Sequence, residues 1–244
     1  MLPPYAELHC VSNFSFLRGA SHAEELVERA RALGYAALAI TDECSLAGIV
    51  RAHVAAKSAK LPLVVGAEFS LRDAFPSSRP ATGAGRRGRA EGPAASQPSG
   101  GPFHSPARLV LLAQNRNGYG NLSELITAAR MRADKGSYRL LREDLASGVA
   151  DCVALLVPSP AVAASLAADG RPRASAFSAL LEQARFLRER FGGRCWIAVE
   201  LLARGYDAAL LERLRAVSKA TGLPLVAAGD VHFHLRSRKR LQDV

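Results

Sequence analysis

The sequence predicts an α/β fold in which strands and helices alternate along the chain, and three observations lead to this class. The chain has 244 residues and is 49% hydrophobic, enough for one full core. Short apolar runs alternate with longer amphipathic stretches, as in βα units. The apolar runs are nearly continuous, which is typical of parallel strands covered on both faces. Six or seven such units favour a closed barrel with a parallel sheet over an open sheet.

Each expected element follows from its local pattern. A first strand precedes His9, and further strands are expected at 36–41, 62–69, 108–115, 152–158, 195–201 and 223–233. Amphipathic periodicity predicts helices at 23–33, 46–59, 119–133, 174–191 and 208–221. Ser21 and Glu24 form an S-x-x-E capping box that predicts the start of the first helix.

One stretch, residues 74–107, departs from this pattern. It is rich in Pro, Gly, Ser, Ala and Arg, and its only large apolar residues are two Phe near its ends. Such a segment buries too little surface to offset its ordering entropy, so we expect a disordered insertion. The same alternation resumes after it, which predicts a single domain over 1–244 with the insertion interrupting it.

The composition indicates the cellular compartment and the type of binding partner to expect. The four cysteines are scattered without a CxxC pair, which indicates reduced thiols and argues against a zinc knuckle. No secretory signal and no apolar run of membrane-spanning length occur, so a cytoplasmic protein without membrane contact is expected. The net charge of +10 and a pI near 10 suit a nucleic-acid partner or merely solvated helix faces, and composition leaves both open.

Groups that bind metals or move protons follow several of the expected strands. In a β/α barrel these strand ends meet on one face, where active sites are built. Carboxylates and imidazoles converging there are typical of a multinuclear Zn, Mn or Fe site, although any one of them could be a helix cap or a buried structural group. The strand-end groups are His9, Asp42, Glu68, Glu200, Asp230 and His232.

Specific stretches then identify a family. "LHCVSNFSFLRGAS", "ALAITDECSLAGIVRAHVAAK", "GAEF", "LVLLAQNRNGYGNLSELITAAR" and "LPLVAAGDVHFHLRSRKRLQDV" resemble the N-terminal PHP (polymerase and histidinol phosphatase) domain of bacterial family-C DNA polymerases. Among these, the error-prone, damage-inducible paralogues of the polymerase III alpha subunit are the most similar. The resemblance spans nearly the whole chain apart from the insertion. It implies a distorted, TIM-like β/α barrel of seven strands.

The resemblance also implies a degenerate metal site. Working family members use about nine ligands around up to three metals, from motifs that begin H-x-H-S and T-D-H and end D-x-H. The positions that keep a ligand are His9, Asp42, Glu68, Asp230 and His232. The positions that have lost one are Val11, Arg18, Glu43, Arg108 and Pro158.

Two functions from different classes follow. The first is the PHP domain of an error-prone polymerase in damage-induced mutagenesis and translesion synthesis, a catalytically silent scaffold that needs no cofactor. The resemblance then implies that nucleotidyl transfer, DNA, accessory mutagenesis proteins and a sliding clamp belong with polymerase domains that continue after residue 244, where we expect the chain to be truncated. The alternative is a phosphoesterase or 3′–5′ exonuclease that uses Zn or Mn. A bare DNA-binding module is a weaker third, since aromatic residues make up only 6%.

The replaced positions suggest what became of the site. Without cations, Asp42, Glu68 and Asp230 would repel one another at the barrel mouth and raise their own pKa values. Arg18 and Arg108 each add positive charge there, and a guanidinium can hold carboxylates bidentately. We therefore expect these arginines to take over part of a metal's electrostatic role; the rival expectation is that both point to solvent.

Overall fold

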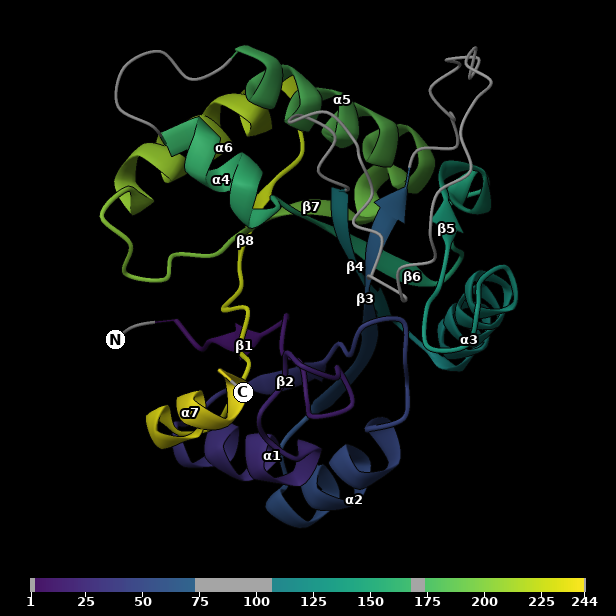
Figure 1. Ribbon diagram of the computed structural model, residues 1–244, viewed down its shortest axis with the longest axis vertical. Helices are drawn as coiled ribbons and strands as arrows, with labels where there is room; N and C mark the ends of the chain where they lie inside the picture. The colour runs from purple at the N-terminus through teal and green to yellow at the C-terminus, as the bar shows by residue number, and fades with distance from the viewer. Residues whose placement is uncertain (1–2, 73–106, 168–173, 244) are drawn as a thin grey trace, which may run out of the picture.

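The computed structural model describes residues 3–72, 107–167 and 174–243 and shows an α/β architecture (Figure 1). Its strands are β1 Ala6–Glu7, β2 Ala37–Ile40, β3 Leu63–Arg72, β4 Ala107–Ala113, β5 Leu140–Leu141, β6 Cys152–Val157, β7 Cys195–Val199 and β8 Leu225–Ala227. Its helices are α1 Ala23–Ala32, α2 Ile49–Ala59, α3 Arg116–Met131, α4 Pro160–Ala167, α5 Ala174–Phe191, α6 Asp207–Thr221 and α7 Lys239–Gln242. In Figure 1, α1, α2 and α7 lie at one end of the strands and α4, α5 and α6 at the other.

The strands form a nearly closed, distorted barrel of seven, which confirms the predicted fold class. Their order is β1-β2-β3-β4-β6-β7-β8, and β5 pairs with β3 off this path. The seam between the first and last strands is joined just beyond them, where Val231 N donates to His9 O at 3.0 Å and Val11 N donates to Val231 O at 2.9 Å. Closure therefore brings residues from both ends of the chain to one mouth.

The sheet is not wholly parallel, and the expectation of a parallel sheet was wrong for one strand. β4 runs antiparallel to both of its neighbours, β3 and β6. Leu71 pairs with Ala107, so β3 and β4 are antiparallel neighbours, a pairing that does not require a crossover helix. Because β4 is reversed, its first residues lie at the same mouth as the carboxyl ends of the parallel strands.

The core explains why the apolar runs are continuous. Along β4, Leu109 and Leu111 belong to the cluster under α3, α5 and α6, whereas Val110 and Leu112 belong to the cluster inside the barrel. Side chains alternate between the two faces of a strand, and here both faces are apolar. A separate cluster packs α1 and α2 against β2.

Several local expectations needed correction. The first helix is capped one residue later than predicted, since Glu25 accepts a hydrogen bond from the backbone N of His22 at 2.9 Å. The hydroxyl of Ser21 is instead paired with His234 at 2.8 Å. Helix α4 was not predicted, and the last strand is much shorter than expected.

The predicted insertion, 74–107, lies outside the described residues except for Ala107, which is the first residue of β4. Its expected disorder therefore stays a prediction. Within the described ranges, none of the helices is long and apolar enough to cross a membrane.

Candidate functional site

The barrel mouth gathers polar side chains from four different strands and the residues just after them. His9 follows β1, Glu200 follows β7 and Asp230 follows β8, while Glu68 lies within β3. Ligand-type atoms of His9, Glu200 and Asp230 lie within 4.8 Å of one another. The convergence expected from the strand ends is thus present.

His9 is the centre of the cluster and is fully buried. Its Nδ1 lies 2.6 Å from Glu200 Oε1 and its Nε2 lies 2.8 Å from Glu68 Oε2. A neutral imidazole has one donor and one acceptor nitrogen, so facing a carboxylate on each side requires the doubly protonated ring. Burial alone would lower the pKa of His9, but hydrogen bonds with Glu200 and Glu68 raise it to about 10. At neutral pH the ring is therefore an imidazolium.

Two arginines surround Glu68. Arg18 donates to both of its carboxylate oxygens at 2.9 and 2.8 Å, and Arg108 donates to the same two oxygens at 3.2 Å each. Burial alone would raise the pKa of Glu68, yet hydrogen bonds from His9 and Arg18 and the charge of Arg108 hold it far below its usual range. The expectation that these arginines pair with carboxylates is confirmed, and the rival, that both point to solvent, is wrong.

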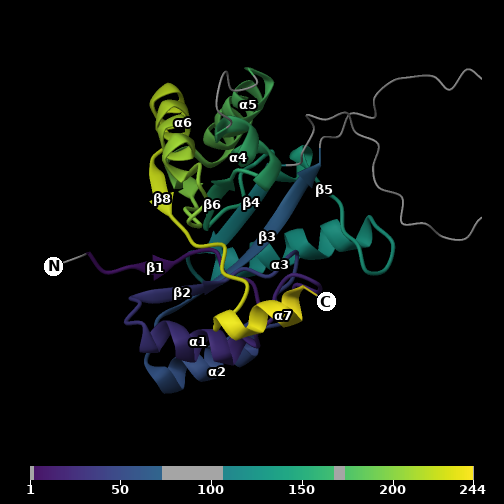
Figure 2. The ribbon, with the colours of Figure 1, turned by 60° about the vertical axis from the view of Figure 1, so that its left-hand side comes forward.

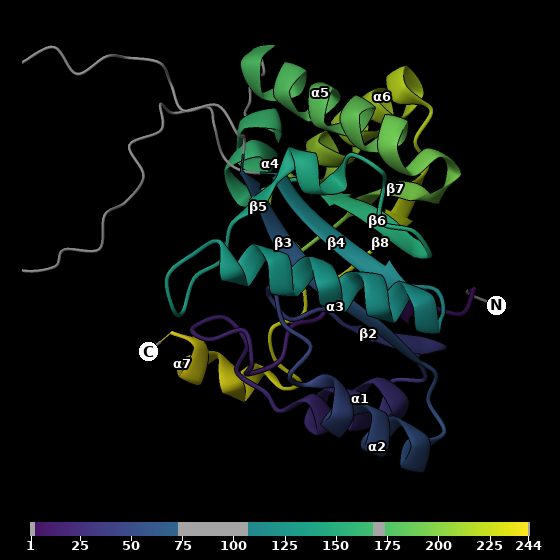
Figure 3. The same cartoon turned by 90° about the vertical axis from the view of Figure 1, so that its right-hand side faces the viewer.

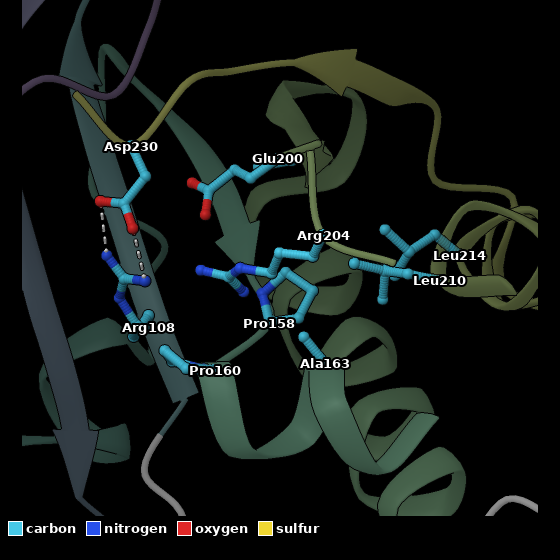
Figure 4. Close-up of a pocket in the computed structure, with 10 residues that line it drawn as sticks. Arg108, Pro158, Pro160, Ala163, Glu200, Arg204, Leu210, Leu214 and Asp230 are labelled. Carbon is cyan, nitrogen blue, oxygen red and sulfur yellow. Dashed lines mark hydrogen bonds and ion pairs between the residues drawn. The ribbon is translucent and has the colours of Figure 1, made fainter. Parts of the chain in front are cut away.

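Arg108 also joins Glu68 to the far side of the mouth. It donates to the two oxygens of Asp230 at 3.3 and 3.1 Å, an interaction drawn in Figure 4. His232 contacts Asp230 at 3.0 Å through Nε2, and its other nitrogen contacts Gln242 at 2.6 Å. Burial would raise the pKa of Asp230, but the hydrogen bond with His232 and the charges of His9 and Arg108 lower it.

Asp42 has a separate set of partners. It accepts hydrogen bonds from the backbone N and hydroxyl of Ser12 and from the hydroxyl of Ser15, each at 2.7 Å. Burial raises the pKa of Asp42, although these hydrogen bonds oppose the shift. Repulsion was expected to raise the pKa values of these carboxylates only in the absence of cations. Arg108 pairs with both Glu68 and Asp230, and the pKa values of both are lowered, in keeping with the expectation that arginines take over part of a metal's electrostatic role.

The other positions where the resemblance implies a lost ligand lie around this cluster. The carboxylate of Glu43 accepts hydrogen bonds from Arg18 at 3.1 Å and from the hydroxyl of Tyr138 at 2.9 Å, so it extends the ion-pair network. Val11 is fully buried and takes part in the seam.

Pro158 is buried after β6 and lines a pocket beside the cluster. In Figure 4 the side chains of Glu200 and Arg204 lie across this pocket from Arg108 and Asp230. The pocket volume is about 20 Å³, enough for a water molecule and far below the roughly 300–1,000 Å³ of ligand pockets.

The donor set can be compared with what the implied divalent metals need. Metal ligands need free lone pairs. Each oxygen of Glu68 accepts from two guanidinium groups, which occupies both of its lone pairs, and each oxygen of Asp230 accepts from Arg108. Among the described residues, the buried polar atoms without a partner include none from this cluster. The residues therefore do not fit a multinuclear metal site. The trio His9, Glu200 and Asp230 has ligand types suited to one ion, in competition with Arg108.

Sequence reasoning missed some of these contributors. Glu200 was recognised at a strand end but was not placed among the retained ligands, although it is the closest partner of His9. Glu7, buried in β1, accepts from the backbone N of His9 and of Gly229 at 2.9 Å each, tying the first strand to the last. A carboxylate inside an apolar strand was the signal for Glu7, because such a group needs buried donors.

Comparisons with known proteins bear on this geometry. The PHP domain family matches residues 7–196. "Error-prone DNA polymerase" is the description of relatives from Dechloromonas aromatica and Bordetella parapertussis, 47% and 46% identical over all of this chain, and of one from Azoarcus sp., 49% identical over 99% of it. The chain spans only about a fifth of the length of these relatives.

Solved structures agree on the fold. A Bifidobacterium adolescentis protein, provisionally assigned as a metal-dependent phosphoesterase, superposes with a TM-score of 0.55 at 14% identity, over 95% of this chain and 88% of its own. An amidohydrolase from Chromobacterium violaceum, solved with sulfate and no metal, also gives 0.55, at 16% identity, over 93% and 87% of the two chains. At these identities the likeness concerns the barrel alone.

Proposed function

This chain belongs to the PHP domain family, and from that premise we propose that it is the N-terminal scaffold of an error-prone DNA polymerase and has no hydrolytic activity of its own. The polymerase would act in translesion synthesis after DNA damage, with nucleotidyl transfer carried out by other domains. Identity of 46–49% over essentially the whole chain to polymerases of that name supports the parentage.

One observation supports the proposal that this domain has no hydrolytic activity of its own. Arg18 and Arg108 both bind Glu68, and Arg108 also binds Asp230, where metal-dependent members of the family need open carboxylates. A guanidinium supplies positive charge but has no site for a water molecule to become a nucleophile, so the cluster stabilises charge without activating water. The small adjacent pocket also leaves no room for a nucleotide.

Elemental analysis of the purified chain, followed by hydrolysis assays, tests this proposal. We expect less than one equivalent of Zn, Mn or Fe, and no manganese-dependent phosphoesterase or 3′–5′ exonuclease activity. The matched positive control is the double variant Arg18→Asp, Arg108→His, which removes both guanidiniums and supplies ligand types, and which should take up more metal. Stoichiometric metal in the unaltered chain, with hydrolysis that His9→Ala abolishes, would overturn the proposal.

The alternative is a metal-dependent phosphoesterase or 3′–5′ exonuclease, and one observation favours it. The proximity of His9, Glu200 and Asp230 suits a single Zn or Mn ion. Binding there would require Asp230 to exchange Arg108 for the ion. Tight zinc binding that is unchanged in Arg108→Met would show that no such exchange is needed and would favour this alternative.

A further inference from the structure

The loop that follows β1 exposes three apolar side chains close to the barrel mouth. In loop 13–19, Phe16 is 84% exposed, Leu17 is 75% exposed and Phe14 is 40% exposed. Single exposed apolar residues are common on protein surfaces, but an apolar group within one short loop is typical of an interaction site.

The loop is held firmly, although its tip is exposed. The hydroxyl of Ser15 donates to Asp42 at 2.7 Å and accepts from the backbone N of Glu43 at 2.9 Å. The backbone N atoms of Arg18 and Gly19 both donate to Ser15 O at 3.0 Å, which closes a tight turn. Beyond the tip, Arg18 is anchored on Glu68. These contacts fix both sides of the tip.

The backbone at the tip is also unfavourable for the residue it carries. Leu17 has a φ of 62°, in the left-handed region that bulky side chains avoid. A freely moving loop would relax this conformation, whereas the anchored turn maintains it and directs Phe16 and Leu17 outward. The arginine that occupies a former ligand position thus holds an apolar tip in place.

The C-terminal segment passes beside this loop. Ala20 N donates to His232 O at 2.8 Å, and the side chain of His232 contacts Gln242 in α7 at 2.6 Å. Figures 2 and 3 both show the purple loop next to yellow α7. On α7, Leu241 is 58% exposed. Apolar side chains are therefore available on both neighbouring elements.

We infer that loop 13–19 together with α7 is a docking surface for the part of the polymerase chain that follows this domain in its longer relatives. The inference rests on the proposed function. The relatives are about five times as long as this chain, and α7, near the end of the stretch that matches them, lies beside the loop. Phe is typical of the cores of protein interfaces. Phosphate contacts need free cations, and the loop's one cation, Arg18, is already paired with Glu68. The exposed cations of this surface are Lys239 and Arg240 on α7, where they suit the polar rim around an apolar centre.

The test measures thiol accessibility in the full-length polymerase that carries this domain. Phe16→Cys and Leu17→Cys are each labelled with a maleimide and read by peptide mass spectrometry. The matched control is Met131→Cys, at a position that is 82% exposed at the end of α3. The native cysteines of the domain are buried and interfere little. We expect the two loop thiols to react at least about tenfold more slowly than the control.

Each other outcome overturns the inference. Equal rates at all three positions would show a free loop. Protection that appears only when DNA is added would indicate a nucleic-acid surface, and protection that depends on protein concentration would indicate a second copy. Because the double variant Phe16→Ser, Leu17→Ser leaves the ion-pair cluster intact, metal content and hydrolysis measured in parallel report on the proposed function independently.

Discussion

Replacing Arg108 with methionine should destabilise the barrel strongly. The Arg108 side chain is 10% exposed and makes four hydrogen bonds, to Glu68 and Asp230. Methionine keeps much of the volume and removes the charge, leaving two buried carboxylates with fewer cations. Removing one partner of a buried ion pair costs about 3–5 kcal/mol. Glu68 keeps His9 and Arg18 and Asp230 keeps His232, so we expect the lower value of about 2–3 kcal/mol.

Urea unfolding and thermal melting measure this loss. For a chain of this size, about 1 kcal/mol corresponds to roughly 2–4 °C in Tm, so a drop of about 4–12 °C is expected. Arg51→Met is the matched control, because Arg51 is 59% exposed and lies 3.6 Å from Glu24. It should cost no more than about 1 kcal/mol. Equal stability of Arg108→Met and the unaltered chain would refute the idea that Arg108 neutralises the cluster.

Three further predictions concern other parts of the chain. Because the pKa of His9 is raised to about 10, the protonated ring stabilises the fold fully below the unfolded pKa of about 6.5, and this contribution is lost as the pH rises toward 10. The free energy of unfolding should therefore fall between these pH values, and it should fall less in His9→Gln. Parallel pH profiles of the two proteins would contradict a protonated His9. Gly229→Ala would place a Cβ 2.3 Å from Glu7 Oε2 and should cost about 1–3 kcal/mol in urea unfolding. The control is Gly120→Ala, where a Cβ would meet no atom within 4 Å from outside its own helical turn. Equal stabilities of the two variants would show that the seam is not closely packed. Replacing residues 76–104 with a short Gly/Ser linker should leave the Tm within a few degrees of the unaltered chain. The entropy of loop closure grows only logarithmically with loop length, and the flanking strands already pair at Leu71 and Ala107. A large drop in Tm would show that the segment is part of the core.

The barrel could be predicted because burial on two faces leaves a direct mark on the sequence. Outward Leu109 and inward Val110 are both apolar, so the strand appears as a continuous run whichever face each residue takes. The same strand shows what such a run cannot reveal. Strand direction depends on the connection, and the sequence between β3 and β4 carries no pattern that sets the direction of β4. The antiparallel pairing therefore required the structure.

The location and the charges of the candidate site could be predicted from the sequence, but not all of its hydrogen-bond partners. Strand ends placed His9, Glu68 and Asp230 at one mouth, and the arginines at positions where the family resemblance implies metal ligands indicated which charges would meet there. The partners of Asp42 were not predictable, because Ser12 and Ser15 lie in a loop whose turn is fixed by hydrogen bonds with no sequence signature. A loop hydroxyl can meet solvent or a buried carboxylate, and only the folded geometry decides which.

Metal binding and arginine pairing compete for the same lone pairs, which constrains how this mouth can function. A divalent ion at Asp230 would have to displace Arg108, and the freed guanidinium would then lie beside the ion in a buried setting, where like charges repel strongly. Its remaining partner, Glu68, also pairs with Arg18 and His9, so the displaced guanidinium would share that one carboxylate with two other cations. Metal affinity should therefore rise when the arginines are removed, at the cost of the ion pairs that stabilise the barrel mouth. The same carboxylates cannot serve both arrangements at once.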